Sequence, residues 1–261
     1  MAELADRYEL YEAAVHDAKA EVQFIRRTFR KLRGRQPRRF REDFSGPASA
    51  ACEWVRGGRS ARAIGVDIEP EVLEWGRRHR LARLRPEARR RVRLVNADVL
   101  GVRTEPVDVI AALNFSYWVF KSRQKLLRYF RNARRSLTAD GLLVLDAFGG
   151  YDAFREIKEH TRHKRFTYVW DQVRYRPVTG ELECHIHFRF PDGSKIDRAF
   201  VYDWRLWTLP ELQDLLHQAG FRRVTVYWEG DDGDGGGNGE FTPDAHGEAD
   251  ATWIAYVVAE N

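Results

Sequence analysis

The sequence contains no apolar run that approaches the length of a bilayer span, and its first residues do not combine a basic segment with an apolar one. We therefore expect a cytoplasmic protein with no membrane partner. Cysteine is scarce as well, because Cys52 and Cys184 are the only two and lie far apart. That number and spacing indicate neither a disulfide framework nor a zinc site, so we expect no bound metal.

Acidic residues are fewer than basic ones, 39 against 44, which leaves a formal net charge of +5. Much of the excess is local and falls between positions 26 and 41. Such a run is typical either of a nucleic-acid contact or of a solvated helix face. Because carboxylates are nearly as abundant over the whole chain, we favour the solvated face and expect no nucleic-acid partner. The residues are Arg26, Arg27, Arg30, Lys31, Arg33, Arg35, Arg38, Arg39 and Arg41.

Glycine is sparse at the one turn where a nucleotide-binding fold needs it. Residues 40–52 predict a tight turn that opens a helix, and a short apolar strand then ends in Asp67, roughly twenty residues after the turn. That offset is typical of a carboxylate that holds a ribose. Dinucleotide binding requires three glycines, but only Gly46 is present, with Phe44 and Ala48 where others would stand. The pattern therefore favours an adenosine cofactor without a pyrophosphate, and it disfavours a nicotinamide oxidoreductase.

Apolar periodicity predicts an α/β fold with a β insertion. Residues 4–29 repeat at three- and four-residue steps, as in amphipathic helices. Short apolar strands then alternate with helices, which is typical of a parallel sheet covered on both faces. We expect strands at 38–44, 62–67, 92–98, 107–114, 142–146, 224–228 and 252–259, and helices at 48–55, 69–84, 123–137 and 208–219.

An antiparallel meander interrupts this alternation, with three extended runs at 165–175, 180–190 and 195–204. The segment 229–250 has no apolar rhythm and is expected to be a loop. We therefore predict a main domain of residues 1–150 and 206–261, with an N-terminal helical cap at 1–36. Residues 151–205 would form an inserted helix and an antiparallel β lid.

An ordered series of acids resembles the class I S-adenosylmethionine-dependent methyltransferases. Glu42 and Asp43 precede the turn, Asp67 stands in Gly-Val-Asp-Ile-Glu-Pro, and Asp98 in Val-Asn-Ala-Asp-Val. The segment 135–146 is similar to the approach to that family's fifth strand. The insertion resembles the lid of small-molecule N-methyltransferases. The resemblance implies a Rossmann-like, mostly parallel seven-stranded sheet with helices on both faces, an antiparallel last strand and an inserted antiparallel β meander.

The resemblance also implies roles for these residues toward S-adenosylmethionine and its product S-adenosylhomocysteine. Asp67 would accept hydrogen bonds from the ribose diol, and Asp98 from the adenine amino group. The backbone N–H of Val99 would donate to the adenine ring, and either Glu42 or Asp43 would face the methionine ammonium. The expected cofactor-binding residues are Glu42, Asp43, Gly46, Asp67, Ile68, Asp98, Val99 and Asn114.

Catalytic and substrate-binding residues leave a weaker signal, because methyl transfer needs alignment more than a particular side chain. Residues 114–118 follow the fourth strand, at the edge where ligands of open α/β folds bind. Tyr8 and Tyr11 lie one helical turn apart, and residues 181–190 alternate between a polar and an apolar face. Each group has an alternative interpretation as plain packing or a solvated stripe. Our candidates are Tyr117, His185 and Tyr11 for catalysis and Tyr8, Trp118, His187 and Arg205 for substrate binding.

These observations favour a methyltransferase that acts on a small polar molecule, at an amine nitrogen, by in-line displacement. We also expect two copies to pair through the inserted sheet. One alternative is an RNA or protein methyltransferase that uses the basic N-terminal segment. The other is a non-catalytic protein that binds a cofactor or nucleic acid through a degenerate site.

Overall fold

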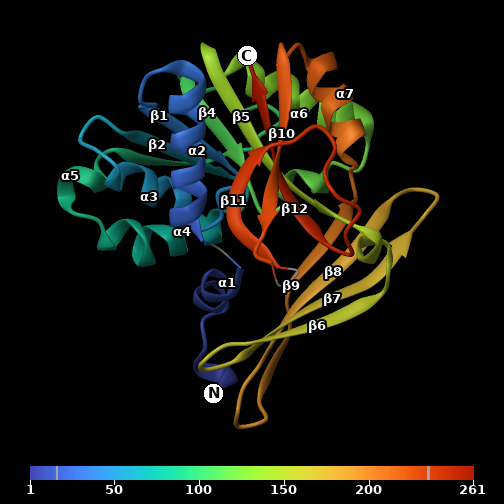
Figure 1. The fold of residues 1–261 in the computed structure, drawn as a ribbon. Helices are drawn as coiled ribbons and strands as arrows, with labels where there is room; N and C mark the ends of the chain where they lie inside the picture. Colours follow the sequence, from blue (N-terminus) through green and yellow to red (C-terminus); the bar gives the residue numbers. More distant parts are fainter. Residues whose placement is uncertain (16, 234–235) are drawn as a thin grey trace.

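A computed structural model describes residues 1–15, 17–233 and 236–261 of the chain. The larger of its two sheets contains β1 (Arg39–Asp43), β2 (Arg62–Asp67), β3 (Val92–Asn96), β4 (Val107–Ala112), β5 (Leu137–Gly149), β10 (Arg223–Asp231), β11 (Gly237–Pro243) and β12 (Trp253–Glu260). Their order is β11-β10-β12-β5-β4-β1-β2-β3 (Figure 1). Strands β1 to β5 pair in parallel, whereas β12 is antiparallel to β5 and β10. The predicted mostly parallel sheet with an antiparallel last strand is confirmed.

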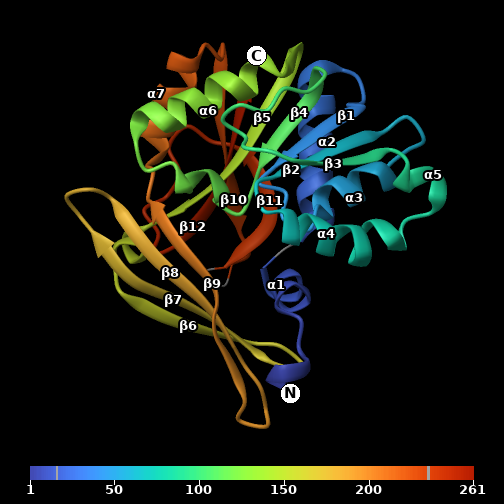
Figure 2. The same cartoon turned by 180° about the vertical axis from the view of Figure 1, so that it is seen from behind.

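Helices cover both faces of this sheet, as Figures 1 and 2 show from opposite sides. Because both faces are covered, the central strand β4 is buried along its whole length. Phe29 and Trp54 pack on one face, and Tyr129 and Leu215 on the other. No helix among the described residues is long and apolar enough to cross a bilayer. The helices are α1 (Arg7–Val15), α2 (Ala18–Arg33), α3 (Ser49–Arg56), α4 (Pro70–His79), α5 (Pro86–Arg89), α6 (Arg123–Arg135) and α7 (Leu209–Ala219).

Local capping explains why α7 has the limits that the sequence predicts. The Thr208 hydroxyl accepts a hydrogen bond from the Glu211 N–H, and the Glu211 carboxylate accepts one from the Thr208 N–H. This reciprocal pair is a capping box, which satisfies two backbone donors of the first turn. Gly220 ends the helix with φ +102°, a conformation that glycine adopts at little cost.

The inserted segment forms a second sheet, the lid, below the carboxyl edge of the first (Figure 1). It consists of β6 (Ile157–Arg162), β7 (Thr167–Arg176), β8 (Glu181–Arg189) and β9 (Lys195–Arg205), paired antiparallel in that order. On β8, Leu182, Cys184, Ile186 and Phe188 are all buried, as the predicted alternation requires. The meander is therefore confirmed.

Helix α1 lies between the lid and the main domain and contacts both (Figure 2). Toward the lid, the Tyr11 ring packs against Phe200 at 5.0 Å between centroids, and the amino group of Met1, ahead of the helix, pairs with the Asp192 carboxylate at 2.7 Å. Toward the main domain, the Trp75 indole N–H donates to Asp6 Oδ2 at 2.5 Å, and Glu12 pairs with Arg80. No residue of α1 is fully buried, so these polar contacts and ring contacts hold it in place.

Three elements differ from the sequence prediction. The segment 229–250, predicted to be a loop, contributes β11, which pairs with β10 and gives the sheet an eighth strand; its residues 234 and 235 lie outside the described part. The expected helix of the insertion is a single 3-10 turn, Tyr151–Phe154, followed by the unpredicted strand β6. Strand β5 begins at Leu137, before the start at residue 142 that the sequence predicts. Strands β6 and β11 are largely exposed edge strands, so they lack the apolar alternation by which strands are recognised.

Candidate active site

The turn after β1 has the backbone of a glycine-rich loop although it contains one glycine. Phe44, Gly46 and Ala48 have φ values of +55°, +49° and +63°. These are the positions where the sequence pattern would place glycines. Left-handed backbone costs an L-residue about 1–2 kcal/mol, so Phe44 and Ala48 keep this geometry at a cost that the surrounding structure must offset.

Asp67 is fixed beside this turn at the end of β2. Its Oδ2 accepts a hydrogen bond from the Gly46 N–H at 2.7 Å, and its Oδ1 accepts from the Glu69 N–H at 2.9 Å. Burial raises the pKa of this carboxyl, and the backbone donors oppose that shift. Each carboxylate oxygen has a further acceptor site, which suits a ribose diol. Ile68, the next residue, is 61% exposed and offers an apolar surface at the same edge.

The loop after β3 places Asp98 on the neighbouring strand end. Asp98 Oδ1 accepts from the Leu100 N–H at 2.8 Å, and Val99 is buried. The Asn132 amide donates to the Val99 carbonyl at 2.8 Å and thereby holds the loop against α6. The amide of Asn96 donates to the Asp67 carbonyl, which ties the ends of β2 and β3 together. The residues predicted to hold ribose and adenine thus lie along one edge.

The structure separates the two acids that the sequence left as alternatives. Asp43 is fully buried, pairs with Arg41 at 2.8 Å and accepts a hydrogen bond from the Tyr129 hydroxyl at 3.0 Å. It lies in the core, so the predicted contact with a ligand ammonium does not fit Asp43. Glu42 accepts from the Ala51 N–H at 2.8 Å at the start of α3, and it is the remaining candidate.

A second strained turn follows β4. Asn114 and Phe115 are both left-handed, with φ +56° and +55°. Their N–H groups donate to the two carboxylate oxygens of Asp146, at 2.6 and 2.9 Å. Burial raises the pKa of Asp146 to about 7, and the two hydrogen bonds oppose this shift. Asp146 therefore fixes Asn114 at the carboxyl edge, a role that the sequence did not reveal.

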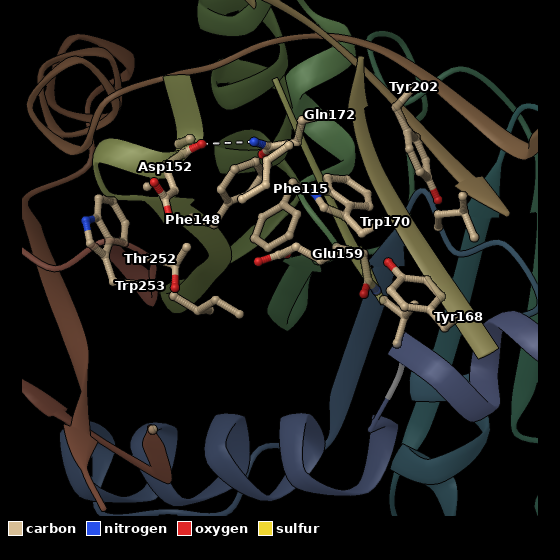
Figure 3. Close-up of a pocket in the computed structure, with 18 of the residues that line it drawn as sticks. Phe115, Phe148, Asp152, Glu159, Tyr168, Trp170, Gln172, Tyr202, Thr252 and Trp253 are labelled. Atoms are coloured by element: carbon tan, nitrogen blue, oxygen red, sulfur yellow. Dashed lines mark hydrogen bonds between the residues drawn. The ribbon is translucent and has the colours of Figure 1, made fainter. Parts of the chain in front are cut away.

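A cavity of about 410 Å³ opens between this edge, α1 and the inner face of the lid (Figure 3). Asn114, predicted to bind the cofactor, and Tyr11, predicted to act in catalysis, both line it. Its walls are aromatic, and its polar groups are mainly acceptors; no Lys, Arg or His of the described residues lines it. The aromatic lining residues are Tyr11, Phe115, Phe148, Tyr168, Trp170, Tyr202, Trp204 and Trp253, and the acidic ones are Asp152, Glu159 and Glu229.

The two tyrosines of α1, Tyr8 and Tyr11, lie in different surroundings. Tyr11 reaches the cavity, which Tyr202 also lines, and burial raises the pKa of the Tyr11 hydroxyl. Tyr8 does not line the cavity. Its ring packs against Trp75 and Phe200, at 5.3 and 5.9 Å between centroids. A role for Tyr8 in substrate binding does not fit this position.

Tyr117 and Trp118 belong to the hydrophobic core and do not line the cavity. Both are fully buried, and the Tyr117 hydroxyl donates to the Asp146 carbonyl at 2.7 Å. The expected catalytic role of Tyr117 and substrate contact of Trp118 therefore do not fit. The packing interpretation of this aromatic segment accounts for both residues.

The histidines of β8 lie on the lid face opposite the cavity, where His185 contacts Glu183 and His187 contacts Asp171. Ligand atoms of Asp171, His185 and His187 lie within 4.8 Å of one another. However, His187 Nδ1 accepts from the Arg198 N–H at 3.1 Å, so its other ring nitrogen carries the proton and faces Asp171. This arrangement is a structural hydrogen-bond network.

Arg205 is also outside the cavity. Its guanidinium pairs with Glu211 at 2.9 Å and stacks on Trp207 at 3.8 Å from the ring centre. His185, His187 and Arg205 therefore do not occupy the predicted catalytic or substrate-binding positions. The sequence showed two faces on β8 but not which one meets the main domain. The apolar face of β8 is the one that meets the main domain. The neighbouring strand β7 adds Tyr168, Trp170 and Gln172 to the same cavity wall.

Comparisons with known proteins agree with this geometry. A family model described as a methyltransferase domain matches residues 45–145, the span that contains Gly46, Asp67, Asp98 and Asn114. No curated protein sequence matches the chain significantly.

Solved structures match along nearly the whole chain. An S-adenosylmethionine-dependent methyltransferase from Clostridium acetobutylicum is 14% identical, with 97% of this chain and 96% of that chain covered and a TM-score of 0.72. CalS10, an amino pentose methyltransferase from Micromonospora echinaspora, is 16% identical, with 97% of each chain covered and a TM-score of 0.67. The sugar N-methyltransferase KedS8 from Streptoalloteichus is 19% identical, with 97% and 93% covered and a TM-score of 0.63. Residues 45–145 therefore match a methyltransferase domain, and the chain has the fold of S-adenosylmethionine-dependent methyltransferases.

Proposed function

We propose that this protein transfers a methyl group from S-adenosylmethionine to an amine nitrogen of a small polar molecule. The observation that carries the proposal is the cavity beside Asn114, which combines aromatic walls with three carboxylates. Carboxylates and aromatic faces both attract ammonium groups. The absence of a basic lining residue among the described ones disfavours an anionic substrate. Structural likeness to amino pentose and sugar N-methyltransferases supports the same substrate class.

The cofactor would lie along the carboxyl ends of β1 to β4. Asp67 suits the ribose diol, because two backbone donors fix its carboxylate beside the turn. Asp98 and Val99 suit the adenine, and Glu42 suits the ammonium of the methionine part. When bound, S-adenosylmethionine supplies a methyl group on a positively charged sulfur, which is already activated for displacement.

The protein's own contribution is alignment and exclusion of water. Asn114 has a rigid backbone, and its side-chain amide has no hydrogen bond to any described residue, so it can orient the acceptor nitrogen. Tyr11 closes the cavity from α1. With the cofactor bound, the site would align the nitrogen lone pair with the methyl group, so that the N–C bond could form as the C–S bond breaks with its electrons left on sulfur; the proton of the methylated nitrogen would leave to solvent.

The basic N-terminal run lends no support to an RNA or protein substrate. Arg33 pairs with Glu260 at 2.6 Å, Arg35 with Asp108 at 2.7 Å, and Arg26 stacks on Trp54. These side chains hold α2 and the following segment to the sheet.

Pairing of two copies through the lid remains part of the proposal. Strands β6 and β9 form the two edges of the lid sheet, and an edge offers backbone groups to a second chain. Light scattering during gel filtration tests this: a dimer mass supports pairing, and a monomer mass at the highest concentration contradicts it.

The test of the proposed function is methyl transfer itself. The protein is incubated with S-adenosylmethionine carrying an isotopically labelled methyl group and with paired acceptors that share one skeleton, one bearing an amine and the other a hydroxyl. We expect label only in the amines, located on nitrogen by mass spectrometry. Label confined to the hydroxyl compounds, or none with any acceptor although the cofactor binds, would contradict the proposal.

A further inference from the structure

The side-chain amide of Gln172, in the cavity wall, has a fixed orientation, so it is known which of its two polar atoms is available to a ligand. Gln172 is 5% exposed, and its amide nitrogen donates to the carbonyl oxygens of Asp152 and Arg155, each at 2.9 Å (Figure 3). Because both partners are acceptors, the nitrogen must face them, and the amide oxygen must face the other way. That oxygen has no hydrogen-bond partner among the described residues. A nine-tenths buried side chain thus presents a fixed acceptor to the cavity.

Three carboxylates line the same cavity as this acceptor. The Asp152 carbonyl accepts from the Gln172 amide, and among the described residues its carboxylate pairs with the exposed Arg155 alone. Glu159 lies opposite Trp170 on the neighbouring strand and has no ion pair or hydrogen bond to any described residue. Glu229, on β10, accepts a hydrogen bond from the Gly239 N–H at 2.9 Å. With no basic residue lining the described cavity, this wall attracts a donor-rich cation.

The nitrogen that is methylated cannot be the one held by these carboxylates. Attack requires a neutral nitrogen with a free lone pair, whereas a carboxylate beside an amine stabilises its protonated form. Asn114, which also lines the cavity, lies next to Asp146, whose two oxygens are both engaged by backbone N–H groups. The cavity therefore offers acceptors for a cation and, at Asn114, a separate place for a neutral amine.

We infer that the substrate carries at least two amino groups. One remains an ammonium group held by the Gln172 amide oxygen, Glu159 and Asp152, while the other lies at Asn114 and receives the methyl group. The aromatic walls from Phe148 and Trp170 cover the body of the substrate between them. The inference rests on the proposed function, and it narrows the substrate class from amines to diamines.

Matched probes test this inference by binding, independently of turnover. Isothermal titration is performed on protein saturated with S-adenosylhomocysteine, with 1,3-bis(aminomethyl)benzene, benzylamine and 3-(aminomethyl)benzoate. The three share one ring and differ in the second group, which is cationic, absent or anionic. We expect the diamine to bind at least tenfold more tightly than benzylamine, and the benzoate not to bind.

Two variants locate the second cation. We expect Glu159→Gln to lower the affinity for the diamine about tenfold, to the level of benzylamine in the wild-type protein, because the variant removes a carboxylate from the ammonium subsite. Glu87→Gln is the matched control, because Glu87 is exposed on α5, away from the cavity. It should change neither affinity.

The outcomes separate the two proposals. Equal binding of the diamine and benzylamine, or a diamine preference that Glu159→Gln does not reduce, overturns the second ammonium subsite and leaves amine methylation standing. Absence of binding by all three probes also overturns the subsite. If S-adenosylhomocysteine itself does not bind, the proposed function fails, and this inference fails with it.

Discussion

At the scale of single residues, the turn after β1 shows that residues other than glycine can adopt the left-handed backbone conformation that is usual for glycine. Phe44 and Ala48 adopt left-handed φ values beside Gly46. Ala48 is fully buried, so its methyl group gains packing that a glycine would lose. The two effects are of similar size, about 1 kcal/mol each, which is why alanine is tolerated here.

Replacing Ala48 with glycine should therefore cost little. We expect the free energy of unfolding for Ala48→Gly to lie within about 1 kcal/mol of wild type, because relief of strain offsets the lost methyl contact. Ala51→Gly is the matched control: Ala51 is equally buried but lies in the helix α3, where glycine adds a cost of about 1 kcal/mol. Urea denaturation measures both. Equal losses in the two variants would show that Ala48 is not strained.

Tyr117 serves as a test of the packing interpretation. We expect Tyr117→Phe to lower the free energy of unfolding by about 1 kcal/mol, because it removes the hydrogen bond to the Asp146 carbonyl. Binding of S-adenosylhomocysteine and of the aromatic amines should not change. Tyr11→Phe, which alters a cavity residue, is the contrasting variant and should weaken amine binding. A loss of ligand binding in Tyr117→Phe with unchanged stability would restore its predicted role in the site.

Asp146 predicts a specific dependence of stability on pH. Its folded-state pKa is raised to about 7 by burial. An unfolded Asp titrates near pH 4, so between about pH 4 and about pH 7 the folded state binds more protons at this group. The contribution of Asp146 to stability therefore falls as pH rises through that window and is level above it.

We expect Asp146→Asn to remove this slope. Denaturation of both proteins at a series of pH values should show the wild type losing stability relative to the variant from pH 4 to pH 7. Asp214→Asn, an exposed site on α7, should run parallel to wild type throughout. Parallel curves for Asp146→Asn as well would mean that this carboxyl does not titrate in that range.

At the scale of elements, α1 is the piece whose attachment is easiest to test. It has no fully buried residue and is held to the main domain by Glu12, whose carboxylate accepts from Arg80 Nε at 2.8 Å and from the Ser49 hydroxyl. We expect Glu12→Gln to increase hydrogen exchange in residues 7–15 severalfold, with little change in the melting temperature of the whole protein, because weakly packed elements open locally. Glu9→Gln, on the same helix, removes only an exposed contact with Arg83 at 3.5 Å and should have little effect. Equal exchange in both variants would contradict an anchoring role for Glu12.

Which elements could be predicted from the sequence depends on where their stability originates. Helix α7 was predicted with its limits because Thr208 and Gly220 are local signals. Strands β6 and β11 were missed because they owe their existence to pairing with β7 and β10, which lie elsewhere in the chain. An exposed edge strand carries little apolar pattern of its own.

The same distinction applies to the site. Asp67 and Asn114 were predicted correctly at the carboxyl edge because strand ends are readable from the sequence. His185 was placed wrongly because alternation defines two faces of a strand but not the one that meets the main domain. The pairing that gathers Trp170 and Gln172 beside Ile186 is a long-range property that no local pattern reports.

At the scale of the whole molecule, the lid and the main domain share one hydrophobic core. The largest apolar cluster joins Leu143 and Leu215 of the main domain to Leu182 and Trp204 of the lid. It crosses the boundaries predicted near residues 150 and 206. The cavity between the two parts is therefore set by continuous packing, while α1, with few buried contacts, is the element best suited to admit ligands.

The most direct test of the account is isothermal titration of S-adenosylhomocysteine into wild-type protein and into Asp67→Ala, with Asp214→Ala as control and NADH as a second ligand. We expect wild type and Asp214→Ala to bind S-adenosylhomocysteine with micromolar affinity. In Asp67→Ala this affinity should fall at least tenfold, and NADH should not bind. Absence of binding by wild type, or unchanged affinity in a folded Asp67→Ala protein, would contradict the account.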